Sequence, residues 1–158
     1  MTLEKFEQSQ LRLKKGQNED ARSQFGAVCY RLHKGKPQVL LITSRRSGRW
    51  VIPKGWPMPG ETPSDAAATE AWEEAGVEGR VHPLCLGIFS YRKFIDRRQS
   101  LPCAVAVFGL RVKRLARRFP EQGQRKRKWV SPKRAAQMVD EPELSQLLER
   151  FDPRGLPI

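Results

Sequence analysis

Histidine and cysteine, the residues most often used to bind zinc or to act as nucleophiles, are scarce in this chain. It has two histidines and three cysteines among 158 residues. Cys29, Cys85 and Cys103 are far apart, so neither a disulfide framework nor a zinc pattern is predicted. Each lies in an apolar run, and we expect buried, reduced thiols and a cytoplasmic protein. His33 and His82 are isolated near predicted turns, where we expect surface or structural roles, and no Ser–His or Cys–His pair suggests covalent catalysis.

Long apolar runs are also missing. A membrane-spanning helix needs about eighteen or more consecutive apolar residues, and no such run is present. The first residues, MTLEKFEQSQLRLKKGQNED, are charged and lack the apolar core of a secretory signal. We therefore expect a polar extension over residues 1–22, with at most a short helix, and one domain over residues 23–158. The sequence gives no indication of oligomeric state.

Acidic residues are outnumbered by basic ones. Thirty Lys and Arg against seventeen Asp and Glu give a net charge of +13. Such a charge favours anionic partners, namely nucleic acid, an anionic membrane surface or a small polyphosphate, without choosing among them. The charge is concentrated in residues 111–134, which hold eleven Lys or Arg and a single acid, Glu121.

The pattern of apolar residues predicts a mixed β-sheet with a few helices, an α/β or α+β domain. Apolar, β-branched runs bounded by Gly and Pro are typical of strands. Ser131 followed by proline favours a helix start. The expected strands are residues 25–32, 39–43, 49–53, 81–94 and 102–112, and the expected helices are residues 131–139 and 142–151.

A further helix is predicted within the stretch GWPMPGETPSDAAATEAWEEAGV, residues 55–77. Thr62 is a suitable N-cap before Pro63, and Gly76 is a suitable C-terminal stop. Apolar side chains recur at helical spacing and should form the buried face. That face would consist of Ala68, Ala71, Trp72 and Ala75.

The opposite face of this helix carries three unpaired acids, Glu70, Glu73 and Glu74. Neighbouring like charges cost roughly 0.2–0.5 kcal/mol per pair, and the last turn of a helix disfavours anions by roughly 0.3–1 kcal/mol. A face selected only for solubility would carry Lys or Arg there. Clustered carboxylate oxygens are what a hard divalent cation requires, so a metal site is predicted.

These residues resemble the signature of the Nudix hydrolases. The signature has glycine, five residues, glutamate, seven residues, then Arg-Glu-U-x-Glu-Glu-x-Gly-U, where U is bulky and apolar. Ala71 is a small substitute for the first U, and Thr69 stands where the family has arginine. In the family that arginine orients the carboxylates by ion pairing, which threonine cannot do. The matching positions are Gly55, Glu61, Glu70, Glu73, Glu74, Gly76 and Val77.

The resemblance implies an α/β/α sandwich that hydrolyses a diphosphate linked to another group, with Mg²⁺ or Mn²⁺ on the glutamates. It assigns Glu70, Glu73 and Glu74 as ligands and Glu61 as a supporting ligand. Glu70 or Glu74, with the metal, is the expected activator of water. Glu121 is the alternative base or an additional ligand.

Wider similarity over residues 24–140 points to diphosphoinositol polyphosphate and diadenosine polyphosphate phosphohydrolases. It includes LLITSRRSGRWVIPKGWPMPGE and QRKRKWVSPKRAAQMV. A highly phosphorylated substrate requires several converging cations. The expected substrate contacts are Arg45, Arg46, Lys54, Gly55, Arg92, Lys93, Arg125 and Arg127.

Two alternatives remain open from the sequence. The high positive charge also suits removal of diphosphate from the 5′ end of RNA, although PKGWP fits less well than the PQGG associated with such enzymes. Thr69 and the basic surface would also suit a Nudix-like module that binds polyphosphate or nucleic acid with little catalysis. Trp50 and Trp129 are expected in the core, with base stacking as the alternative.

Overall fold

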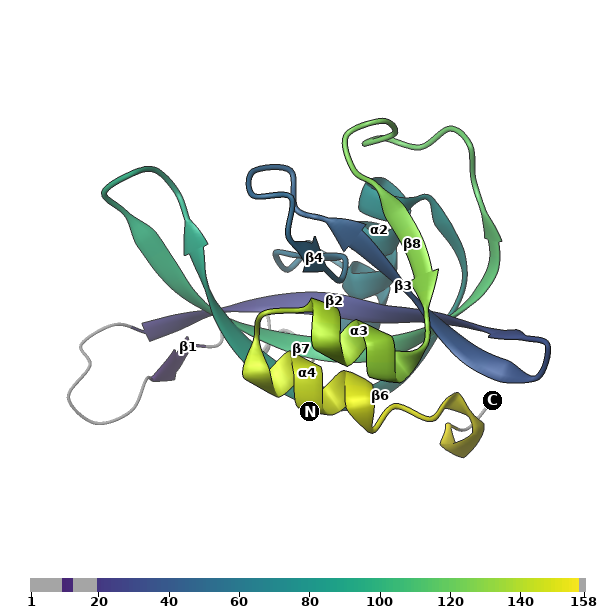
Figure 1. Cartoon of the computed structure of the whole chain (residues 1–158). Helices are drawn as coiled ribbons and strands as arrows, with labels where there is room; N and C mark the ends of the chain where they lie inside the picture. The colour runs from purple at the N-terminus through teal and green to yellow at the C-terminus, as the bar shows by residue number, and fades with distance from the viewer. Residues whose placement is uncertain (1–9, 13–19, 157–158) are drawn as a thin grey trace.

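The computed structural model describes residues 10–12 and 20–156, and Figure 1 shows the arrangement of the elements. In chain order they are β1 (Gln10–Arg12), β2 (Asp20–His33), β3 (Lys36–Thr43), β4 (Trp50–Val51), β5 (Lys54–Gly55), α2 (Pro63–Ala75), β6 (Val77–Phe94), β7 (Ser100–Leu115), β8 (Arg127–Val130), α3 (Pro132–Met138), α4 (Pro142–Glu149) and a 3-10 turn (Pro153–Gly155). Among the described residues strands predominate, with one α-helix between β5 and β6 and two α-helices after β8.

The strands form one open, mixed sheet. Its central order is β4-β3-β2-β7-β6, with β1 and β5 paired to β2 and β8 paired to β3. Strands β2 and β7 are parallel, whereas the other pairs are antiparallel. The predicted mixed sheet is therefore confirmed.

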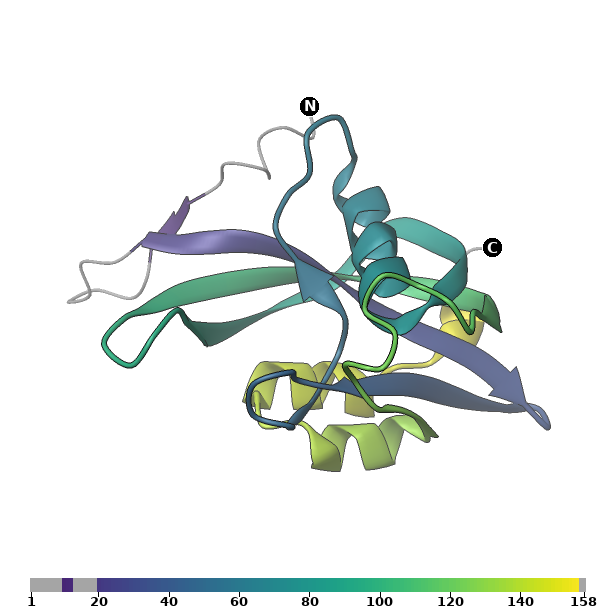
Figure 2. The ribbon, with the colours of Figure 1, turned by 90° about the horizontal axis from the view of Figure 1, so that it is seen from above.

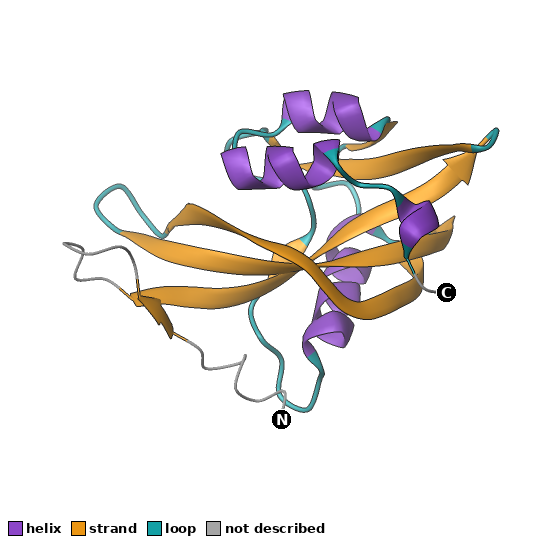
Figure 3. Cartoon of the chain, turned by 90° about the horizontal axis from the view of Figure 1, so that it is seen from below, coloured by secondary structure: helices purple, strands orange, loops and turns teal. Residues whose placement is uncertain are grey.

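Helices cover both faces of this sheet, as Figures 2 and 3 show from two sides. Alternate residues of β2 explain the layers, because successive strand side chains point to opposite faces. Val28 and Tyr30 pack in the core beneath α3 and α4. Phe25 and Cys29 pack in the core beneath α2. The expected α/β/α sandwich is confirmed.

Helix α2 has the boundaries that its capping residues predict. The Thr62 side chain accepts a hydrogen bond from the backbone of Asp65, and Gly76 ends the helix with a φ of 68°. The predicted buried face is wrong in part, because Trp72 is half-buried and Glu74 is buried. The face against the sheet is made of small residues, which let the helix approach closely. They are Ala66, Ala67, Ala71 and Ala75.

Three expectations outside the helix have mixed outcomes. Cys29 and Cys103 are buried as expected, but Cys85 is exposed, because it lies in β6 at the sheet edge. His82 is buried and shares a 2.9 Å hydrogen bond with the Tyr30 hydroxyl, in agreement with a structural role. Trp50 and Trp129 are half-buried and pack against the two cores.

The N-terminal extension contributes to the sheet where it is described. Residues 10–12 form β1 and pair with β2, whereas the sequence suggested at most a short helix. Residues 1–9 and 13–19 of the predicted extension lie outside the described residues. Within the described part of the chain, no helix is long and apolar enough to cross a membrane. The cytoplasmic location stays a prediction.

Candidate active site

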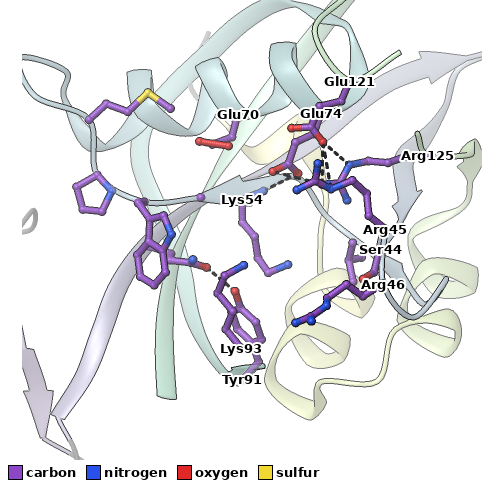
Figure 4. Close-up of a pocket in the computed structure, with 16 residues that line it drawn as sticks. Ser44, Arg45, Arg46, Lys54, Glu70, Glu74, Tyr91, Lys93, Glu121 and Arg125 are labelled. Atoms are coloured by element: carbon purple, nitrogen blue, oxygen red, sulfur yellow. Dashed lines mark hydrogen bonds and ion pairs between the residues drawn. The ribbon is translucent and has the colours of Figure 1, made fainter. Parts of the chain in front are cut away.

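A cavity of about 490 Å³ lies between α2, β5 and the loops on either side of them, and Figure 4 shows its walls. The acids lie on the helix side with Arg45 and Arg125 beside them, and the other cations lie on the opposite side (Figure 4). The acids are Glu70, Glu74 and Glu121, and the cations are Arg45, Arg46, Lys54, Lys93 and Arg125. The structure thus brings together most of the residues predicted for the site.

Gly55 allows the carboxylate of Glu70 to lie against the backbone of β5. A Cβ atom at this position would overlap the Glu70 carboxylate. Burial, followed by the charges of Glu74 and Glu73, raises the pKa of Glu70 to about 8. A carboxylate held against backbone and against like charges is poised to bind a cation.

Glu74 is the most buried of the signature acids. Its Oε1 atom accepts a hydrogen bond of 3.4 Å from the backbone N–H of Lys54, and Oε2 lies 3.9 Å from Nη2 of Arg125. Burial raises its pKa, and this outweighs the opposing effects of Arg125 and Lys54. Glu74 therefore faces the cavity from a buried position, with cations already beside it.

Glu121 reaches the same cavity from the loop before β8. Its backbone N–H donates to the carbonyl of Glu73 at 3.0 Å, which ties the loop to the last turn of α2. Arg125 Nη2 lies 3.0 Å from its carboxylate and Arg45 Nε lies 3.8 Å away. The Nη1 atom of Arg125 also donates to the carbonyl of Thr43 at 3.1 Å. The loop is thus anchored at both sides of the cavity.

Lys54 lies at the centre of the basic side. Its ammonium group lies 4.7 Å from the centre of the Tyr91 ring, and burial lowers its pKa. The Tyr91 hydroxyl in turn donates to Gln24 at 2.7 Å. Arg46 donates to the carbonyl of Phe94 at 2.6 Å, linking the β3–β4 loop to the β6–β7 hairpin. The contact with the Tyr91 ring restricts the position of Lys54, and the hydrogen bond to the Phe94 carbonyl restricts that of Arg46.

Two of the predicted substrate contacts lie elsewhere. The Arg127 guanidinium donates to the carbonyls of Ala75 and Ala116, at 2.9 and 3.2 Å, and stabilises the end of α2. Arg92 borders a second cavity and donates to Ser100 at 2.9 Å. Their basic character and the family resemblance led to the prediction that both contact the substrate, but the sequence does not reveal where their side chains point.

Glu61 and Thr69 face each other on the other side of α2. The Thr69 hydroxyl lies 2.9 Å and 3.2 Å from the two oxygens of Glu61, and both residues border a pocket of about 620 Å³. A hydrogen bond therefore supplies part of the orientation that an arginine gives in the family signature. Glu73 is half-buried on the same helix, and its side chain interacts electrostatically with Glu70.

We expect Thr69→Val to lower turnover about tenfold, because Glu61 loses its donor while the helix keeps a side chain of the same shape. Thr69→Ser keeps the hydroxyl and should retain the wild-type rate. Steady-state kinetics of both variants, with thermal unfolding to verify the fold, would test this. Equal rates for Thr69→Val and the wild type would show that the hydrogen bond does not support catalysis.

The donor set fits a magnesium or manganese ion. Among the described residues, no group of three or more His, Cys, Asp or Glu side chains is arranged so that it could hold a metal ion by itself. Mg²⁺ usually takes only one or two carboxylates and completes its shell with water and substrate phosphates. Glu70 and Glu74 meet this requirement, because both border one cavity and repel each other without a cation.

Sequence reasoning missed Glu141, which is 8% exposed. Its Oε1 atom is, within the described part of the chain, the one buried side-chain nitrogen or oxygen without a hydrogen-bond partner. Its Oε2 atom lies 3.4 Å from Arg49 Nη1. An acid before Pro142 looks like an ordinary helix cap in the sequence, and only the packing distinguishes it.

The fold and the acidic helix beside a basic cavity define a member of the NUDIX domain family, and the family model matches residues 22–151. The chain belongs to this family. Nudix hydrolases act on phosphoanhydride bonds and generally use divalent metal ions. The resemblance seen in the sequence is therefore confirmed.

Several known proteins are similar to this chain. The chain is 34% identical over 121 residues to Nudix hydrolase 13, mitochondrial, of Arabidopsis thaliana, covering 73% of this chain and 60% of the relative. It is 31% identical over 134 residues to diphosphoinositol polyphosphate phosphohydrolase 3-alpha of Mus musculus, covering 82% and 77%. A C. elegans Ap4A hydrolase binary complex matches with a TM-score of 0.60 and 26% identity, covering 82% and 93%. The matched region thus spans 60% of the length of the Arabidopsis relative, less than two thirds.

Proposed function

We propose that the protein is a metal-dependent pyrophosphohydrolase that cleaves a phosphoanhydride bond of a highly phosphorylated substrate. The substrate class is a diphosphoinositol polyphosphate or a dinucleoside polyphosphate. One observation carries the proposal: Glu70 and the buried Glu74 border a single cavity together with five cations. Relatives named for both substrate classes support it.

The acidic residues would bind the metal ion, and Lys54 would bind the phosphate. Glu70 and Glu74 would hold Mg²⁺ or Mn²⁺, with Glu73 as the further ligand that the signature predicts. Glu61, which lies on the other side of α2 and accepts a hydrogen bond from Thr69, would support the helix instead. The ion supplies neutralisation of negative charge on the phosphate oxygens. Lys54, at the centre of the cavity, would bind phosphate and orient it towards the acids.

Three carboxylates are in a position to accept the proton of the attacking water. Glu70 and Glu74 are the bases that the signature predicts, and Glu121 borders the same cavity. Arg125 fixes Glu121 through Nε and Nη2, both 3.0 Å from Oε1. Positioning and electrostatics account for most of the catalysis in phosphoryl transfer, so a fixed carboxylate is suited to this role.

Hydrolysis of a substrate panel would test the proposal. The panel comprises a diphosphoinositol polyphosphate, diadenosine polyphosphates, ADP-ribose and triphosphorylated RNA, each with and without Mg²⁺. We expect Mg²⁺-dependent cleavage of one polyphosphate class, lost in Glu74→Gln and retained in Glu149→Gln, an exposed site on α4. No cleavage of any compound, with tight and salt-sensitive binding, would replace this proposal with the binding-module alternative.

A further inference from the structure

A second cavity, of about 710 Å³, adjoins the first. We call it the distal chamber. The β3–β4 loop, the β6–β7 hairpin and the turn between α3 and α4 border it, and Figures 1 and 3 show where these segments lie. The two cavities share walls, so one elongated ligand could occupy both. The shared residues are Ser44, Arg46, Val51, Lys54, Tyr91 and Lys93.

A carboxylate with one unpartnered oxygen borders the distal chamber. Glu141 precedes α4, but its side chain makes no capping hydrogen bond. Arg49 Nη1 lies 3.1 Å from Asp140 and 3.4 Å from Oε2 of Glu141, which leaves Oε1 of Glu141 unsatisfied. The charges of Glu141 and Lys54 also interact, so this acid lies near the junction of the two cavities.

A buried acceptor without a hydrogen-bond partner destabilises the folded state. The Glu141 side chain is not needed as a cap for α4, so capping does not explain why this cost is tolerated. Glutamine has the same shape and would cost less to bury without a partner. A ligand that donates a hydrogen bond to Oε1 would remove the cost. The exposed carboxylate of Asp140 beside it adds a second negative charge to the same wall.

Two acids on one wall also indicate which ligand group belongs there. The chamber also has six Lys and Arg side chains that can hold phosphates, but an ionised phosphate has no proton to donate to Oε1 of Glu141. A nucleobase carries N–H donors that carboxylates accept. Phe94, which is 65% exposed, borders the same chamber and offers a ring for stacking. Lys54 and Lys93, shared with the first cavity, lie where the phosphates of such a substrate would run.

We propose that the distal chamber is a nucleobase subsite in which Glu141 accepts a base N–H, so that the substrate is a nucleoside polyphosphate. This inference rests on the proposed hydrolase function, which it narrows from two substrate classes to one. Arg49 is a positioning residue, because it donates to Oε2 and leaves Oε1 for the base.

Glu141→Gln tests the subsite with almost no change in shape. Arg49 donates a hydrogen bond, so the glutamine oxygen should take the place of Oε2 and the amide NH₂ should take the place of Oε1. The amide NH₂ of the glutamine would then face the N–H of the base, and two donors cannot form a hydrogen bond with each other. The unfolding midpoint should stay close to that of the wild type, because the buried charge is removed while the NH₂ in place of Oε1 also has no partner in the free protein. Glu149→Gln, exposed at the other end of α4, is the matched control.

Calorimetry would compare ADP and GDP with inorganic tripolyphosphate, which has no base. We expect the wild type and Glu149→Gln to bind both nucleotides more tightly than tripolyphosphate. Glu141→Gln should weaken nucleotide binding about 10–100-fold without affecting tripolyphosphate. Equal binding of nucleotides to wild type and Glu141→Gln would overturn the subsite, and so would equal losses for nucleotides and tripolyphosphate. If Glu141→Gln does not fold, wild-type protein that binds nucleotides no more tightly than tripolyphosphate would overturn it as well.

Hydrolysis separates this inference from the proposed function. Mg²⁺-dependent cleavage of diadenosine tetraphosphate in preference to a diphosphoinositol polyphosphate, reduced in Glu141→Gln, would support both. Cleavage of either compound that Glu141→Gln leaves unchanged would overturn the subsite and keep the hydrolase. Loss of nucleotide binding in Glu141→Gln, in a protein that hydrolyses neither compound, would keep the subsite and reject the hydrolase.

Discussion

Glu74→Gln is expected to lower kcat about 10²–10⁴-fold, the range for removal of an essential acid or base. Glu74 is buried beside Glu70 at the cavity, where it combines a hydrogen bond from the Lys54 backbone with the nearby guanidinium of Arg125. Glutamine keeps an acceptor for Lys54 but removes the negative charge that would hold a cation. Activity should therefore fall far more than stability.

Single-turnover hydrolysis and Mn²⁺ binding, measured together with thermal unfolding, would test this expectation. Glu73→Gln is an informative companion, because Glu73 lies on the same helix and its carbonyl, not its carboxylate, anchors Glu121. A Glu73→Gln loss as large as that of Glu74→Gln would assign Glu73 to the metal as well. A Glu74→Gln enzyme with wild-type kcat and Mn²⁺ affinity would contradict the role assigned to Glu74.

The sequence was most informative where local chemistry decides the structure. Thr62, Pro63 and Gly76 fixed the ends of α2, because capping depends on a few adjacent residues. Helical spacing alone was less reliable for the buried face of α2. The side of α2 that packs against the sheet consists of its alanines and Glu74. Which side this is depends on where β2 and β5 lie, and no local sequence pattern gives that.

The roles of the other site residues depend on contacts with residues that are distant in the sequence. Arg125 and Arg127 are two residues apart, yet one pairs with Glu121 and the other stabilises the end of α2. Thr69 cannot form the ion pair expected of arginine, but its hydroxyl reaches Glu61. Such outcomes depend on loop paths and on which side of a strand faces the cavity, and neither follows from composition or periodicity.

Metal affinity is expected to rise steeply with pH, because the pKa of Glu70 is about 8 in the metal-free protein. Below that pH a cation must displace the proton, so apparent affinity should fall towards tenfold per pH unit, about 50-fold in all between about pH 8 and pH 6. Mn²⁺ titrations across this range would measure the slope. Glu70→Gln should bind Mn²⁺ weakly with a shallower slope, and a wild-type affinity independent of pH would contradict the prediction.

The same raised pKa predicts the opposite trend for the stability of the metal-free protein. Between the ordinary pKa of 4.5 and about 8, folded Glu70 keeps a proton that the unfolded chain releases. The folded state therefore binds more protons, and its stability is full below about 4.5 and declines as pH rises through this window. Mg²⁺ should restore the unfolding midpoint most at the upper end, where its carboxylate ligands are ionised. Midpoints recorded in chelator and in Mg²⁺ should thus diverge as pH increases, and Glu70→Gln should reduce this divergence, because the carboxylate that links the proton to the cation is gone.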